Sequence, residues 1–150
     1  MDINELYKYV ELFHNMILEI KNDLSPEFQN FPNGSCGTTS ILLGTFLNKT
    51  GFGKFKMKIG EKGFWENNIW QEYSHAWLES NHLLVIDITA YQFPVVNEKI
   101  LIKKDSLWHK EWKVLEVVKN ANIYKTNATT TTDFQNYEKI VGVIKQKGLI

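Results

Sequence analysis

Apolar residues recur at helical spacing near both ends of the chain. Between positions 2 and 21 they stand three or four apart, at Ile3, Leu6, Tyr7, Val10, Phe13, Ile17 and Ile20. This period predicts an amphipathic helix over 2–21, capped by Asp2 or Asn4. A similar pattern follows Asp133, which is suited to an N-cap, and stops before Gly148. The two ends of the chain are therefore predicted to be helical.

A further helix is predicted after a polar, glycine-containing turn. Asn33, Gly34 and Ser35 suit a turn or an N-cap, and Gly51 suits the end of the helix. The apolar residues between them are Ile41, Leu42, Leu43, Phe46 and Leu47. These residues cover a broad face of the helix, which predicts that the helix is largely buried, with Cys36 in its first turn.

The middle of the chain alternates as strands do. Residues 55–59 alternate apolar side chains with lysines and predict a strand that ends at 60–63. The clearest strands are predicted at 73–79 and 83–89, joined into a hairpin by 80–82.

Further along the chain the signals are shorter. Strands are predicted at 100–102 and 112–118, with a loop or short helical turn at 105–110 between them. Residues 64–70 mix aromatic and amide side chains, and we expect a loop whose tryptophans pack on the core, with an aromatic lip beside a site as the alternative. A polar connector is predicted at 126–132.

This order of elements places helices apart from a run of antiparallel strands. Such an order predicts an α+β fold rather than a doubly wound sheet. No internal repeat or domain boundary is visible, so we expect one domain over 1–150.

Charge and composition narrow the range of functions. The 150 residues hold 17 Lys plus Arg and 17 Asp plus Glu, and this balance argues against a nucleic-acid partner. No apolar run has the length of a membrane span, and the N-terminus lacks the pattern of a secretory signal. We therefore expect a cytoplasmic protein without a membrane partner, with delivery into another cell as an effector or toxin as the alternative. The sequence does not determine the oligomeric state.

The single cysteine stands where a nucleophile would be activated. At the start of a helix, free backbone amides and the helix dipole favour an anion, which lowers a thiol pKa. The same amides stabilise an oxyanion. The alternative is that Cys36 is a small buried hydrophobe.

His75 and Asp87 interrupt strands that are otherwise fit for burial. A buried carboxylate needs a donor, and the neighbouring strand offers His75. A three-residue connection predicts Glu79 opposite Leu83 and His75 opposite Asp87 on one face. A two-residue turn would place Asp87 on the other face.

The three residues together fit a thiol-dependent catalytic triad. Cys36 is the predicted nucleophile, His75 the general base and then acid, and Asp87 the group that orients the imidazole. The predicted reaction is attack on an acyl carbon, giving a thioester that water or an amine resolves. The candidates for oxyanion or substrate contacts, besides the amide of Cys36, are Gln29, Asn30, Asn33, Gly37, Trp77 and Gln92.

These segments resemble the transglutaminase-like branch of the papain-like thiol enzymes. The segments are Gly34-Ser35-Cys36-Gly37, Ser74-His75-Ala76-Trp77-Leu78-Glu79 and Ile86-Asp87-Ile88-Thr89-Ala90-Tyr91-Gln92-Phe93. The resemblance covers about 31–93. It implies a papain-like fold and a Cys-His-Asp enzyme that acts on an amide bond of a protein or peptide. The family includes cysteine peptidases, protein-glutamine deamidases, transglutaminases and acyltransferases, and the short chain suits a small deamidase or amidase such as some bacterial effectors contain.

Other interpretations remain. A metal site of Cys36, His75, His82 and Asp87 lacks the short spacings of zinc motifs, so no metal is predicted, with His82 expected at the hairpin tip and His109 in a surface loop. No cofactor motif is present, and none is predicted. A transglutaminase or acyltransferase with an amine acceptor, or a non-catalytic binding module on the same fold, are the alternatives. Of the four histidines, the remaining one, His14, is expected to be partly exposed.

Overall fold

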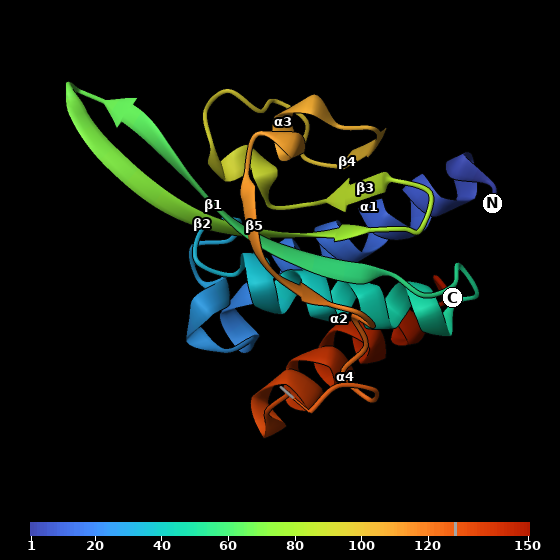
Figure 1. The fold of residues 1–150 in the computed structure, drawn as a ribbon. Helices are drawn as coiled ribbons and strands as arrows, with labels where there is room; N and C mark the ends of the chain where they lie inside the picture. Colours follow the sequence, from blue (N-terminus) through green and yellow to red (C-terminus); the bar gives the residue numbers. More distant parts are fainter. Residues whose placement is uncertain (128) are drawn as a thin grey trace.

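Within its described residues, the chain combines four α-helices with one antiparallel sheet. The computed structural model describes residues 1–127 and 129–150, so Ala128 of the predicted connector lies outside the described residues. In chain order the elements are α1 (Ile3–Ile20), α2 (Cys36–Lys49), β1 (Lys56–Glu66), β2 (Ile69–Glu79), β3 (Leu84–Asp87), β4 (Leu101–Lys104), α3 (Leu107–Lys110), β5 (Lys113–Val118) and α4 (Thr131–Gln146), shown in Figure 1. Short 3₁₀ turns cover Lys21–Asp23, Pro26–Phe28 and Ala90–Gln92. The predicted α+β class is confirmed.

The sheet has the strand order β4-β3-β2-β1-β5. β1 and β2 pair without interruption from Lys56 opposite Glu79 to Glu66 opposite Ile69. Beyond the other strands this pair continues as a long two-stranded hairpin, which projects to the upper left in Figure 1. We call residues 61–74, the projecting part, the arm.

The arm replaces the loop predicted at 64–70, and β1 does not end at 60–63. Asn67 and Asn68 form the connecting turn with positive φ angles of 52° and 65°, as a tight hairpin turn with the right-handed strand twist requires. The two glycines of β1 serve close packing rather than chain termination. A Cβ on Gly60 would lie 3.0 Å from the carbonyl oxygen of Lys113, and one on Gly63 would lie inside the ring of Trp70.

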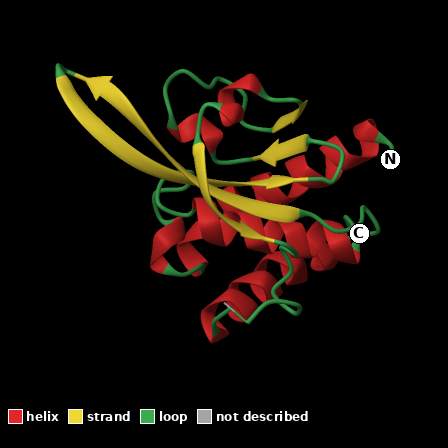
Figure 2. Ribbon diagram, in the orientation of Figure 1, coloured by secondary structure: helices red, strands yellow, loops and turns green. Residues whose placement is uncertain are grey.

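Helices α1 and α2 lie on one face of the sheet with α4 packed against both helices, and the β3–β4 connection and α3 lie on the other face (Figure 2). We call the two buried groups the aliphatic face and the aromatic face. The aliphatic face includes Val10, Leu42, Leu47, Ala76, Leu78 and Ile140. The aromatic face includes Trp77, Val85, Phe93, Leu101 and Trp112. The alternation of side chains along β2 sends Ala76 and Leu78 to one face and Trp77 to the other.

The first helix begins where the sequence predicts. The Asp2 carboxylate accepts from the amides of Asn4, at 2.9 Å, and Glu5, at 3.2 Å, which identifies Asp2 as the cap. His14, expected to be partly exposed, is instead buried, with Nε2 2.9 Å from the Tyr91 hydroxyl. That expectation was wrong because the 3₁₀ turn after β3, where Tyr91 lies, covers this side of α1.

The last helix starts slightly earlier than predicted. Thr130 is the N-cap of α4, and Asp133 completes a reciprocal capping box with it. Gly148, with φ of 69°, follows the last turn as predicted. The short strands β4 and β5 and the helical turn α3 also occur where the sequence predicts them. Within the described residues, no helix has the length and apolarity needed to cross a bilayer.

Candidate active site

The β2–β3 hairpin sets the geometry of the site. Leu78 pairs with Ile86 and Glu79 with Val85, so the register is shifted by two residues from the predicted pairing of Glu79 with Leu83. The connection spans 80–83 and is closed by a hydrogen bond from the Ser80 amide to the carbonyl of Leu84, the first residue of β3, 2.9 Å long. Because the shift is even, it leaves every side chain on its predicted face.

His75 and Asp87 therefore meet diagonally on the aromatic face. The distance from His75 Nε2 to Asp87 Oδ2 is 2.7 Å, and the two side chains are 0% and 1% exposed. A carboxylate only accepts hydrogen bonds, so Nε2 of His75 carries the hydrogen and Nδ1 faces away from Asp87.

The carboxylate of Asp87 is held at both oxygens. Oδ1 accepts from the amides of Thr89 and Ala90, each at 2.9 Å. Oδ2 accepts from His75 and also from His109 Nε2, each at 2.7 Å. Burial alone would raise the pKa of Asp87, but the charge of His75 and the hydrogen bonds from both histidines outweigh burial and lower this pKa well below its usual range.

His109 is the site residue that the sequence interpretation missed. It was expected in a surface loop, but it lies in α3 and is 3% exposed. Ser106, the N-cap of α3, accepts from the His109 amide, and its Oγ lies 2.6 Å from His109 Nδ1. The spacing Ser106-x-x-His109 indicates a capped helical turn, but only the fold brings this turn to Asp87.

Cys36 occupies the first position of α2 and is half-buried. Ser40 Oγ donates to the Ala76 carbonyl at 3.3 Å, which joins the start of α2 to β2 beside His75. Burial raises the pKa of the Cys36 thiol, but the hydrogen bond and charge of His75 and a backbone hydrogen bond from Ala76 bring it below its ordinary value. The structure thus brings the predicted nucleophile to the predicted base.

The imidazole of His75 shows the opposite shift. Burial lowers its pKa, whereas the charge and hydrogen bond of Asp87, followed by those of Cys36, raise it to about 9. A lowered thiol pKa beside a raised imidazole pKa favours transfer of the proton from Cys36 to His75.

Of the predicted oxyanion candidates, Gln92 lies beside the site. Its Nε2 lies 3.4 Å from His75 Nδ1 and donates to the Thr89 carbonyl at 3.1 Å. Gly37, the second residue of α2, lies beside Cys36, so its amide belongs to the free first turn of the helix.

The other candidates make contacts of a different kind. Gln29 is exposed and donates to the carbonyls of Lys21 and Leu24. Asn30 and Asn33 are exposed and belong to a turn closed by a backbone hydrogen bond between them. Trp77 is 1% exposed and stacks on His75 with ring centroids 5.9 Å apart, so it packs behind the imidazole instead of facing a substrate.

His75, Asp87 and His109 are also the group that could hold a metal ion. One ligand atom from each lies within 4.8 Å of the others. However, both nitrogen-to-oxygen distances are hydrogen-bond distances, and the raised pKa of His75 favours the imidazolium, which cannot ligate. His82, from the other metal set considered, is exposed at the hairpin tip, as predicted.

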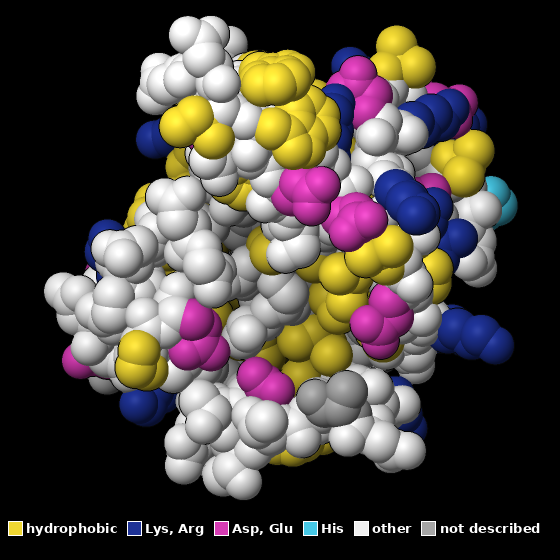
Figure 3. Space-filling model, turned by 60° about the vertical axis from the view of Figure 1, so that its left-hand side comes forward, with side chains coloured by type: hydrophobic (Ala, Val, Ile, Leu, Met, Phe, Trp, Pro, Cys, Tyr) yellow, Lys and Arg dark blue, Asp and Glu magenta, His cyan; other side chains and the backbone are white. Residues whose placement is uncertain are grey.

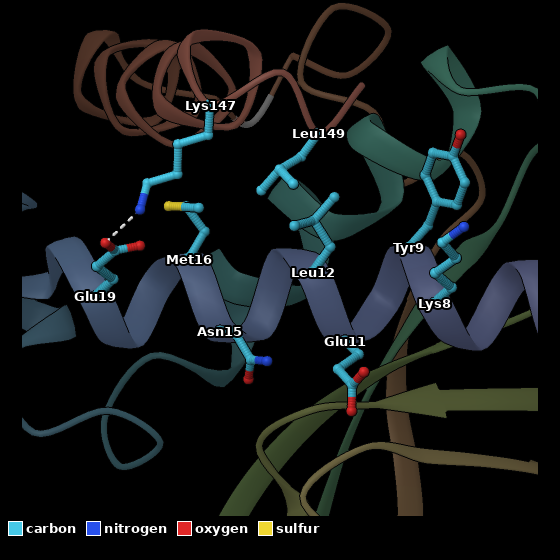
Figure 4. A pocket seen from close by; sticks show the side chains of 9 residues that line it. All are labelled: Lys8, Tyr9, Glu11, Leu12, Asn15, Met16, Glu19, Lys147 and Leu149. Atoms are coloured by element: carbon cyan, nitrogen blue, oxygen red, sulfur yellow. Dashed lines mark hydrogen bonds and ion pairs between the residues drawn. The ribbon is translucent and has the colours of Figure 1, made fainter.

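A hollow of about 420 Å³ lies between α1 and the segment after α4, as Figure 4 shows. It includes the ion pair of Lys147 and Glu19 at 2.6 Å. Its lining residues are Lys8, Tyr9, Glu11, Leu12, Asn15, Met16, Glu19, Lys147 and Leu149. None of them belongs to the cluster around Asp87, so this hollow is separate from the candidate site.

Comparison with protein-family models, with curated proteins and with solved structures finds no match to this chain.

Proposed function

We propose that the protein is a cysteine hydrolase that cleaves an amide bond of a protein or peptide, as a peptidase, an amidase or a protein-glutamine deamidase. The observation that carries the proposal is the buried pair of His75 and Asp87, with 2.7 Å between Nε2 and Oδ2, beside a Cys36 thiol whose pKa His75 lowers. Nδ1 thereby faces away from Asp87, where it also lies 3.4 Å from Gln92 Nε2, and it is the imidazole atom that would take the thiol proton. The papain-like, transglutaminase-like fold suggested by the resemblance is part of the proposal.

The first step forms an acyl-enzyme. The Cys36 thiolate attacks the amide carbon and forms a carbon–sulfur bond, and the carbonyl oxygen becomes an oxyanion. The amide of Cys36 and the side chain of Gln92 are the proposed donors to that oxyanion. As the carbon–nitrogen bond breaks, His75 gives its Nδ1 proton to the leaving amine or ammonia, and a thioester remains.

The second step restores the thiol. His75 takes a proton from water, the hydroxyl adds to the thioester carbon, and the carbon–sulfur bond breaks to release the acid. An amine in place of water would give a transamidated product, the outcome expected of a transglutaminase or acyltransferase. Ammonia release and amine incorporation on a glutamine-containing peptide distinguish these outcomes.

The test of the Cys-His pair is the rate of iodoacetamide labelling of native Cys36 across pH, followed by mass spectrometry. We expect fast labelling at neutral pH in the wild type, because the lowered pKa makes thiolate there. In His75→Ala the labelling rate at neutral pH should fall to that of an ordinary thiol or lower.

His82→Ala is the matched control, since His82 is exposed and distant in the hairpin. It should label like the wild type. Labelling that begins only on unfolding, or that is equal in His75→Ala and the wild type, contradicts the proposal and favours a non-catalytic binding module.

A further inference from the structure

The arm exposes a pair of tryptophans that its own strands hold in place. Trp65 and Trp70 are directly paired across β1 and β2 and are 72% and 49% exposed. Their rings make an edge contact with centroids 5.3 Å apart. Trp70 lies over Gly63, where a Cβ would be 1.9 Å from the ring. The missing side chain at Gly63 therefore lets the indole lie flat on the hairpin.

The tryptophan pair belongs to the face of the sheet that carries α2. Along β2, side chains two residues apart share a face, so Trp70, Glu72 and Ser74 lie on the same side as Ala76, which packs among the helices. The Ala76 carbonyl also accepts a hydrogen bond from Ser40 on α2, the helix that begins at Cys36. The exposed row therefore leads from the tip of the arm to the nucleophile.

We call this row the arm strip, and its members are Glu61, Gly63, Trp65, Trp70, Glu72 and Ser74. Its charged members are both acidic, and the Trp70 indole Nε1 lies 3.5 Å from Glu72. The basic residue of the arm, Lys62, is on the opposite face, where it pairs with Glu111 at 2.7 Å. In Figure 3, where this side of the molecule comes forward, hydrophobic side chains gather at the top of the face and acidic side chains lie directly below them.

We propose that the arm strip binds an extended segment of the substrate polypeptide and holds a Lys or Arg side chain between Trp70 and Glu72. This assignment rests on the proposed function of Cys36. A cation over an indole face, beside a carboxylate, gains from both groups. A surface of this charge repels phosphate, so the acidic strip opposes binding of a nucleic acid or an anionic membrane.

The length of the strip gives the position of that basic residue. Ala76 follows Trp70 by six residue steps along β2, which corresponds to about 20 Å of strand. An extended substrate covers about 3.3–3.6 Å per residue. The Lys or Arg should therefore stand about six residues from the amide that reaches Cys36.

The test is peptide binding to Cys36→Ala, which keeps the strip but removes the thiol. The probes are fluorescein-labelled Gly/Ser/Ala peptides that contain one glutamine. Each carries Arg, Ala or Glu about six residues before or after the glutamine. Binding is measured by fluorescence anisotropy at low salt. We expect the Arg peptide to bind about tenfold more tightly than the Ala peptide, and the Glu peptide more weakly than both. Added salt should reduce the preference.

Three variants in the Cys36→Ala background locate the binding. Trp70→Ala and Glu72→Gln should each remove most of the Arg preference. Gly63→Ala should do the same without a change of charge, because its Cβ displaces the Trp70 ring. Glu138→Gln, on α4, removes the same charge away from the arm and should leave the preference unchanged.

Equal binding of the three peptides by Cys36→Ala, or binding of none of them, overturns the proposal. So does an Arg preference that stays as large after Gly63→Ala or Trp70→Ala as it is in Cys36→Ala alone. These results do not depend on turnover. If Cys36 is inert in the labelling experiment but the Arg preference is intact, the hydrolase is rejected and the arm strip is retained as a binding site. If Cys36 is reactive but the Arg preference is absent, the arm strip is rejected and the hydrolase is retained.

Discussion

The two faces of the sheet are built on different principles. The aliphatic face is closed by Leu, Ile, Val, Phe and Met side chains from three helices. The aromatic face buries a carboxylate and two imidazoles among tryptophans, and among the described residues the indole N–H groups of Trp77, Trp108 and Trp112 have no hydrogen-bond partner. Such unpartnered donors cost free energy. The first face is organised for stability, whereas the second accepts a cost to hold charged groups in one geometry.

This difference separates what each face should control. Loss of a side chain on the aliphatic face should lower the free energy of unfolding and leave the reactivity of Cys36 unchanged. Loss of a polar group on the aromatic face should change reactivity more than a matched change elsewhere. Four measurements test this separation.

The largest expected effect is that of Asp87→Asn on turnover. The neutral side-chain amide that replaces the carboxylate cannot stabilise the imidazolium of His75. Its NH₂ group would also face two histidines, His75 and His109, which both donate hydrogen bonds to this position. By analogy with the corresponding change in serine-protease triads, we expect kcat on a glutamine-containing peptide to fall about 10⁴-fold. The pKa of Cys36, measured by alkylation, should rise toward that of a free thiol. Near-normal turnover would remove Asp87 from the mechanism.

The converse change is Ile140→Ala on the aliphatic face. Ile140 is fully buried in α4, away from Cys36. Urea unfolding should show a loss of about 2–5 kcal/mol, because the truncation leaves a cavity. Iodoacetamide labelling of the folded variant should match the wild type. A large change in labelling rate under native conditions would show that the two faces are not separable.

His109→Phe tests the second donor to Asp87. The ring packing on Trp77 and Trp108 is kept, and the hydrogen bond to Oδ2 is lost. A hydrogen bond to a charged group contributes about 1.5–3 kcal/mol, so we expect turnover to fall about 10- to 100-fold.

His109→Gln offers a replacement donor and should recover part of that activity and restore the pH profile of labelling. A purely structural role for His109 would give the same labelling profile in both variants.

The smallest effect is the pH dependence of stability. The folded pKa of His75 is raised from 6.5 to about 9, so its contribution is complete below pH 6.5 and is lost as the pH rises through about 9. The loss is at most about 1.4 kcal/mol per pH unit for one proton. Urea titrations from pH 6 to 10 should show this decline in the wild type and its absence in His75→Ala. An unchanged decline in that variant would assign it to other groups.

The arm shows where sequence reasoning failed and why. Residues 64–70 carry aromatic side chains at irregular spacing, and Gly60 and Gly63 were interpreted as the end of the strand. In the structure β1 and β2 continue through them because each strand supplies the other's hydrogen bonds. Trp65 and Trp70 were expected in the core, but no element of the described chain covers that side of the arm tip. Their exposure depends on what packs nearby, which strand periodicity does not encode.

The candidate site likewise contains residues that the sequence predicted and one that it did not. The helical period placed Cys36 at a helix start, and alternation together with a three-residue connection placed His75 and Asp87 on one face despite a register error of two residues. These features survive because they depend on local periodicity and parity. His109 could not be found this way, because its contact with Asp87 joins positions 22 residues apart through a turn whose direction only packing fixes.

The sequence by itself determined the α+β class, most of the helices and strands, the place of Cys36 at a helix start and the shared face of His75 and Asp87. Local hydrogen bonding and side-chain period specify these, and both act over a few residues. Tertiary structure alone decided that two imidazoles share one oxygen of Asp87, that Gln92 reaches His75 while Gln29 does not, and that the arm stands free. Each of these is a contact or an exposure between distant segments, which is set by how the layers pack.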